Sequence, residues 1–188
     1  IWVSTVYAPS SVTIEDNAIC ANRQSGIYFV EDLYGTATVR YNVIGAGYWP
    51  PELSLWGNGG DGIYMSGVYG TATIDNNIIS GNGMVGSDGI YINMVDGSVD
   101  ILDNIIGAWE FWYDAEYHQM VPGNNGDGIE VFNIQPGGRV NIEGNNISEN
   151  RGNGIDLGTP CEVNGDVTIR DNTIGAWEDG EGGTYYGN

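Results

Sequence analysis

The clearest pattern along the chain is a short segment in which apolar and polar residues alternate. In each copy an apolar residue, a polar residue and then Ile or Val stand five, four and three positions before an asparagine. Alternation at period two is typical of a β-strand that buries one face. The six copies of this predicted strand are residues 12–14, 37–39, 72–74, 99–101, 140–142 and 167–169.

The asparagine that follows each predicted strand begins a second repeated element. It starts an Asn-x-Ile motif that is followed by Gly, Ser or Cys, and successive copies are 25, 35, 27, 41 and 27 residues apart. Short and long intervals alternate, so the full unit is a double repeat of 60 to 68 residues. The six asparagines are Asn17, Asn42, Asn77, Asn104, Asn145 and Asn172.

A third repeated element begins at a Gly-Ile pair, at residues 26–27, 62–63, 89–90, 128–129 and 154–155, and Ile1 fits the same place. Two or three short strands in each unit of 25 to 27 residues are typical of a solenoid, because a single coil cannot bury its apolar side alone. We therefore expect an all-β solenoid of about six coils forming a single domain over residues 1–188. The asparagines should form an internal ladder at one corner. Long insertions follow Gly45, Gly107 and Gly175 and should project from one face.

Two stretches carry a resemblance to a known family. The runs NNIISGNGMVGSDGIYI (76–92) and GNNISENRGNGIDL (144–157) resemble the repeats of parallel β-helix proteins. These are the pectate-lyase-like proteins and many large bacterial and archaeal surface proteins. The resemblance covers essentially the whole chain and implies a right-handed parallel β-helix. It leaves the activity open, since this scaffold carries lyases, hydrolases, epimerases, adhesins and inert spacers.

Charge excludes several classes of partner. The chain has 25 acidic residues against 5 arginines and no lysine, a net charge of −20. Such a surface repels nucleic acid and anionic lipid, whereas it attracts divalent cations or basic partners. A solvated acidic surface of a secreted protein explains the same numbers. No apolar run approaches the ~20 residues of a membrane span, and Cys20 and Cys161 show no metal-ligand spacing.

Catalytic signatures of the related enzymes are missing. The polygalacturonase-type motifs that the resemblance would imply (Asn-Thr-Asp, Asp-Asp, Gly-His-Gly and Arg-Ile-Lys) are absent, and His118 is the only histidine. We therefore assign no catalytic residue and favour a structural or adhesive protein over an enzyme. The alternatives are a carbohydrate-active β-helix resembling polysaccharide lyases or epimerases and a glycan-binding module without catalysis.

Three carboxylates share one repeat position. Asp61, Asp88 and Asp127 each precede a Gly-Ile pair, so stacked coils should place them about 4.8 Å apart in a column. Like charges at this spacing repel unless they are screened. Either Ca²⁺ binds between them, or each aspartate caps its own glycine turn through backbone hydrogen bonds. No other cofactor is expected.

Aromatic residues form a second predicted column. Trp2, Tyr28, Tyr64 and Tyr91 follow the isoleucine of the Gly-Ile strand and should point outward. They either bind sugar rings or another protein, or pack on one another along the sheet. The long insertions carry further aromatic side chains that we predict to form an interface; their tryptophans are Trp49, Trp56, Trp109, Trp112 and Trp177.

Neither end of the repeat shows a capping element. The first residues match the start of a Gly-Ile strand, and the last two, Gly187 and Asn188, match the end of an insertion. We therefore expect a segment of a longer repeat array or a subunit that associates with itself, head to tail or laterally. A filament, sheath or adhesin at the cell surface is the favoured function.

Overall fold

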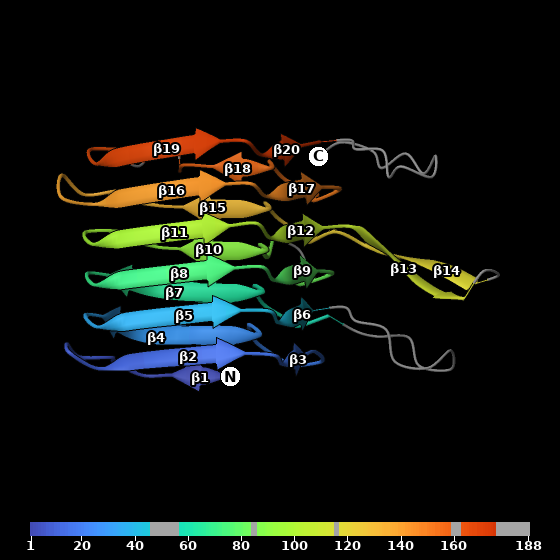
Figure 1. The fold of residues 1–188 in the computed structure, drawn as a ribbon, viewed down its shortest axis with the longest axis horizontal. Helices are drawn as coiled ribbons and strands as arrows, with labels where there is room; N and C mark the ends of the chain where they lie inside the picture. The colour runs from blue at the N-terminus through green and yellow to red at the C-terminus, as the bar shows by residue number, and fades with distance from the viewer. Residues whose placement is uncertain (46–56, 84–85, 115–116, 159–162, 176–188) are drawn as a thin grey trace.

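The solenoid consists of three walls, each formed by one parallel sheet. A computed structural model of the chain describes residues 1–45, 57–83, 86–114, 117–158 and 163–175, with the backbone alone for 109–121. Three parallel sheets of six strands run along its axis, and each of the six coils gives one strand to each sheet (Figure 1). The predicted all-β solenoid of six coils is confirmed.

We name the walls sheets A, B and C in the order in which each coil visits them. Sheet A contains β1 (Trp2–Val3), β4 (Ile27–Leu33), β7 (Ile63–Val68), β10 (Ile90–Ile92), β15 (Ile129–Val131) and β18 (Ile155–Asp156). Sheet B contains β2 (Ser11–Glu15), β5 (Thr36–Arg40), β8 (Thr71–Asp75), β11 (Ser98–Leu102), β16 (Arg139–Glu143) and β19 (Asp166–Arg170). Sheet C contains β3 (Ala18–Ile19), β6 (Val43–Gly45), β9 (Ile78–Ser80), β12 (Ile105–Gly107), β17 (Asn146–Ser148) and β20 (Thr173–Ile174).

Alternation along each strand sets the core. In sheet B every strand pairs with its neighbours over five residues without a register shift. Equivalent apolar residues therefore lie one above another, and Ile74, Ile101 and Ile142 are fully buried. The Gly-Ile and Asn-x-Ile isoleucines enter the same core from sheets A and C.

The asparagine corner forms the predicted ladder, which we call the first Asn ladder. In five consecutive coils the backbone N–H of the ladder asparagine donates to Oδ1 of the asparagine one coil ahead, at 2.8–3.1 Å. The residue before each ladder asparagine has φ between 52° and 71°, which turns the chain from sheet B to sheet C. Asp, Asn, Gly and one Tyr hold this left-handed position.

A second ladder of asparagines runs along the turn between sheets C and A, and sequence reasoning did not identify it. The side-chain amide of each member donates to Oδ1 of the next at 2.7–3.0 Å. Its members are Asn22, Asn58, Asn82, Asn124 and Asn150. The signal was present, because three of them stand five residues after a first-ladder asparagine and two close the long insertions as Gly-Asn.

A hairpin replaces part of the second predicted long insertion. Strands β13 (Trp109–Asp114) and β14 (Tyr117–Val121) pair antiparallel and project from the solenoid beyond β12 (Figure 1). The segment between them lacks the Asn-Gly or Asp-Gly pair that signals a hairpin, so the sequence alone does not predict these two strands. In the part of the chain that is described, no helix is long and apolar enough to cross a membrane.

Candidate functional site

The outward face of sheet A carries a continuous row of aromatic rings, which we call the ring column. Neighbouring ring centroids lie 5.0 Å apart from Trp2 to Tyr28, 4.7 Å from Tyr28 to Tyr64 and 5.2 Å from Tyr64 to Tyr91. The structure thus brings together the four aromatic residues singled out from the sequence. Phe132 adds a fifth ring 5.8 Å from Tyr91.

Phe132 could have been found from the sequence by extending the alternation of β15. Ile129 and Val131 point inward, so Glu130 and Phe132 share the outward face. Glu130 occupies the position that the aromatic residues hold in earlier coils. The ring column therefore ends beside a carboxylate.

Ring orientation limits what the column can bind. Tyr64 and Tyr91 stack at an interplanar angle of 14°, so each covers part of the other's face. Aromatic pairs of this kind contribute about 0.5–1.5 kcal/mol beyond their buried area. Trp2 stands edge-on to Tyr28 at 80° and is 61% exposed. The inner rings therefore stabilise the wall, and Trp2 offers the ring surface most open to a ligand.

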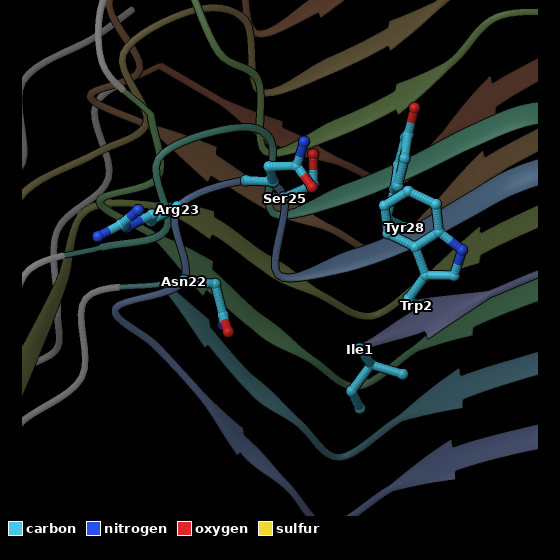
Figure 2. A pocket seen from close by; sticks show the side chains of 7 residues that line it. Ile1, Trp2, Asn22, Arg23, Ser25 and Tyr28 are labelled. Carbon is cyan, nitrogen blue, oxygen red and sulfur yellow. The ribbon is translucent and has the colours of Figure 1, made fainter.

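A groove lies between Trp2 and the turn that leads into β4. Its volume is about 460 Å³, and Figure 2 shows the rings of Trp2 and Tyr28 on one side and the side chains of the turn on the other. A second hollow of about 320 Å³ continues along the next coil to Tyr64. We call the first hollow the N-terminal groove; its lining residues are Ile1, Trp2, Asn22, Arg23, Gln24, Ser25 and Tyr28.

The three aspartates at the start of sheet A form hydrogen bonds between coils. The backbone N–H of Asp88 donates to Oδ1 of Asp61 at 2.9 Å, and that of Asp127 donates to Oδ1 of Asp88 at 2.7 Å. The backbone N–H of Asn153 donates to Asp127 in the same way. Each carboxylate thus caps the turn of the following coil, whereas the capping alternative from the sequence placed these bonds within its own turn.

Two of these aspartates join Glu130 in a carboxylate cluster. One oxygen each of Asp88, Asp127 and Glu130 lie within 4.8 Å of one another. The cluster contains Glu130 where the sequence suggested Asp61, because the outward face of β15 brings that side chain beside the turn of the preceding coil. Glu130 stands at a different repeat position from the aspartates, so the repeat pattern alone does not predict that these side chains meet.

Burial, followed by the hydrogen bond with Glu130, raises the pKa of Asp88 to about 8. Burial also raises the pKa of Glu130, but the same hydrogen bond lowers it. Asp88 therefore stays protonated, and its carboxyl O–H donates a hydrogen bond to the ionised carboxylate of Glu130. Burial raises the pKa values of Asp61 and Asp127 as well.

The carboxylate cluster is better placed to hold neighbouring coils together or to bind a metal ion than to act on a substrate. Asp88 is only 5% exposed, so an external substrate does not reach its carboxyl group. Ca²⁺ prefers six to eight oxygen ligands, of which these three carboxylates could supply part once Asp88 lost its proton. Without a metal, one proton held between Asp88 and Glu130 lowers the charge of the cluster from −3 to −2 and so weakens the repulsion.

A further row of rings lies at the turn between sheets A and B. Tyr7, Tyr34 and Tyr69 stack with centroids 6.0 and 5.0 Å apart and interplanar angles of 3° and 19°. All three are exposed, and the Tyr34 hydroxyl donates to Asp32 at 3.2 Å, which raises the pKa of Tyr34. We call this row the tyrosine stack. Sequence reasoning missed it because only Tyr34 and Tyr69 share a Tyr-Gly pair.

The side chains of the five tryptophans expected at an insertion interface lie outside the part of the chain that the structure describes. Trp49, Trp56 and Trp177 are beyond the described residues, and Trp109 and Trp112 are placed only through the backbone of β13. Their role as an interface stays a prediction.

The two ends of the solenoid differ in how their core residues are covered. In the last coil Val163, Ile169 and Ile174 are 44–48% exposed. Their equivalents in the first coil, Val6, Ile14 and Ile19, are only 6–8% exposed. In sheets B and C inner side chains are thus covered mainly by the coil that follows them along the axis, whereas in sheet A the first-coil Ile1 is 46% exposed and its last-coil equivalent Ile155 is partly buried. We call Val163, Ile169 and Ile174 the C-terminal end face.

Comparison with known proteins supports the fold. A family model described as "Right handed beta helix region" matches residues 1–187. No curated protein and no solved structure matches the chain. Three parallel sheets, in-register coils and a family match across nearly the whole length agree, and the chain belongs to the right-handed β-helix family.

Proposed function

We propose that this protein is a structural or adhesive β-helix of the cell surface, in which copies stack head to tail into a filament or sheath. The observation that carries the proposal is the C-terminal end face. Its three aliphatic side chains are about half exposed, although equivalent residues of inner coils are fully buried. Covering them with a further coil contributes roughly 1 kcal/mol each.

Backbone groups favour the same arrangement. The strands β18, β19 and β20 form the last edge of three parallel sheets. An open edge presents unpaired N–H and C=O groups, and another strand satisfies them. A further coil of this repeat fits that edge, because successive coils already pair in this way at five junctions within the solenoid. The extracellular location is part of the proposal and rests on the resemblance of the repeats to those of large surface proteins.

The test compares two lysine substitutions in one strand. Ile174→Lys charges the C-terminal end face, whereas Thr173→Lys adds the same charge to a neighbouring residue outside the core column. We expect wild type and Thr173→Lys to form concentration-dependent multimers in size-exclusion chromatography. Ile174→Lys should weaken association at least tenfold with an unchanged circular dichroism spectrum. Equal association of both variants would count against stacking through this face.

A second candidate function is glycan binding in the N-terminal groove. It is favoured by the combination of an exposed indole ring with the polar side chains of Arg23 and Gln24 in one hollow. Aromatic rings stack on the apolar face of a sugar, and polar side chains bind its hydroxyls. Titration calorimetry with a panel of oligosaccharides tests it. Binding that is lost in Trp2→Ala and retained in Tyr69→Ala, a change in the tyrosine stack, would support this function, and no binding by wild type would end it.

A further inference from the structure

The internal repeat defines what a correctly placed second copy would contact. Sheet B pairs in register from β2 to β19, so Ser11, Thr36, Thr71, Ser98, Arg139 and Asp166 form one row across the wall. One more coil in the same register would set Ser11 of the next copy beside Asp166. The remaining four residues of β2 and β19 then pair one to one.

We infer that copies join in this coil register, so that Arg170 of one copy pairs with Glu15 of the next. The inference rests on the proposed head-to-tail stacking and specifies its geometry. Arg170 and Glu15 are the two ends of one row, which reads Glu15, Arg40, Asp75, Leu102, Glu143, Arg170. The row thus begins with an acid and ends with a base.

Each of the two ion pairs in this row joins an acidic and a basic residue of neighbouring coils. Arg40 lies 2.6 Å from the carboxylate of Glu15, and Arg170 lies 2.7 Å from that of Glu143. The side chain of Arg170 is still 59% exposed and that of Glu15 is 42% exposed, so each can take a second partner. The junction would extend the alternation, with Arg170 between Glu143 and Glu15 of the next copy. Exposed ion pairs add little affinity, so this contact selects the register.

Hydrogen bonding selects the same register and polarity. Each ladder asparagine donates its backbone N–H to Oδ1 of the asparagine one coil ahead, up to the bond from Asn145 to Asn172 at 2.9 Å. Asn172 is the last member and Asn17 the first. In coil register, Oδ1 of Asn17 in the next copy is the acceptor for the backbone N–H of Asn172. A head-to-head contact would bring two acceptor ends together.

The core columns also continue. Ile169 would lie beside Ile14 of the next copy and Ile174 beside Ile19, which repeats the isoleucine pairs of the inner coils. A shift of one residue would instead place Ile169 against an outward threonine or glutamate, because side chains alternate along a strand. Apolar burial, charge and the asparagine ladder therefore agree on one register.

A disulfide across the junction tests the register. Thr13 and Thr168 are outward residues of β2 and β19 that face each other across this junction. Adjacent strands lie about 4.8 Å apart, within the Cα range of a disulfide. In the full chain, with Cys20 and Cys161 replaced by serine, we expect Thr13→Cys/Thr168→Cys to oxidise into a covalent ladder of multimers.

Matched variants exclude other arrangements. Ser11→Cys/Thr168→Cys places the thiols about 8 Å apart in the proposed register, beyond disulfide reach, and should yield at least tenfold less multimer. Mixing the two single variants, Thr13→Cys and Thr168→Cys, should give dimers only, and neither alone should cross-link. Circular dichroism checks that each variant keeps its β structure.

Two contrary results are distinguishable. Elongated particles in electron micrographs that cross-link through Ser11→Cys/Thr168→Cys, or through one single variant, would overturn the register and leave stacking in place. An absence of both elongated particles and cross-links in every variant would overturn the proposed stacking and the register together.

Discussion

At the scale of the residue, the asparagines of the first Asn ladder stabilise the corner between sheets B and C through their side-chain hydrogen bonds. The side-chain amide of Asn104 donates to the carbonyl oxygens of Ile74 and Leu102, both at 2.9 Å, and to Oδ1 of Asn145. Its own Oδ1 accepts the backbone N–H of Asn77 at 2.8 Å. One buried side chain therefore pairs three backbone groups of two successive coils and a side-chain oxygen of a third, which a hydrophobic residue of similar size would leave without these bonds.

Replacing Asn104 with alanine should be strongly destabilising. The change leaves at least two buried backbone groups without partners, and each costs about 1–3 kcal/mol. We expect Asn104→Ala to lower the free energy of unfolding by about 3 kcal/mol or more in urea titrations. Asn17→Ala, at the exposed end of the same ladder, is the matched control and should cost less. Equal losses would show that burial of the ladder is unimportant.

The carboxylate cluster makes stability depend on pH. The pKa of Asp88 is about 8 in the folded protein, above its ordinary value of 3.8, so the folded state binds more protons than the unfolded state between these values. Stability from this group is full below about pH 4 and is lost as the pH rises through about 8. We expect the melting temperature to fall by several degrees between pH 5 and pH 9.

Asp88→Asn isolates this effect. The asparagine can donate to Glu130 as the protonated aspartate does, and it does not ionise. Its melting temperature should decline less with pH than that of wild type, whereas Asp100→Asn, on the outward face of sheet B, should behave as wild type. Excess chelator should leave the melting temperature at pH 6 unchanged. A fall on chelation would instead show a bound cation in the cluster.

At the scale of the element, glycines at the ends of sheet C strands let the coils approach. Gly107 closes β12 with φ of 119°, and a Cβ added there would collide with the carbonyl oxygen of Ser148 on the next coil. Gly45 at the end of β6 has φ of 109° and meets the carbonyl oxygen of Ser80 in the same way. The long insertions therefore leave the solenoid from a position that accepts only glycine.

Alanine at Gly107 should separate backbone strain from coil packing. Gly107→Ala suffers both a positive φ and a collision, and we expect a loss of about 3 kcal/mol or more in the free energy of unfolding. Gly86→Ala is the matched control, since Gly86 has φ of 82° but open space around its Cβ. It should lose only about 1 kcal/mol. Similar losses in chemical denaturation would argue against close packing at Gly107.

The strands could be predicted from the sequence because their signals repeat. Each alternating segment before a ladder asparagine became a strand of sheet B, and residues at one repeat position became neighbours in the stack. Repetition does not reveal contacts between different positions. Glu130 joins Asp88 because the turn before sheet A lies beside the outward face of the next coil, and this depends on coil shape.

At the scale of the whole molecule, electrostatics and burial oppose each other in self-association. Each copy carries a net charge of −20, and two copies repel at low ionic strength. The Arg170 pair at the junction involves a single exposed contact, so it cannot outweigh repulsion between the whole molecules. The apolar end face must supply the favourable energy.

Salt should therefore strengthen stacking. Raising sodium chloride from about 0.05 M to 0.5 M shortens the screening length and weakens repulsion between copies, while burial of the end face is retained. We expect the average mass in sedimentation velocity at fixed protein concentration to increase severalfold. The Ile174→Lys variant should show a smaller increase. Weaker association at high salt would point to a contact held by charge.

The most direct test of the central claim is electron microscopy of the purified chain at high concentration and moderate salt. The account predicts unbranched filaments one solenoid wide, in which every copy adds six coils. At about 4.8 Å for each coil, the axial repeat of the filament is about 29 Å. Single particles no longer than six coils, at every concentration and salt level, would contradict head-to-tail stacking.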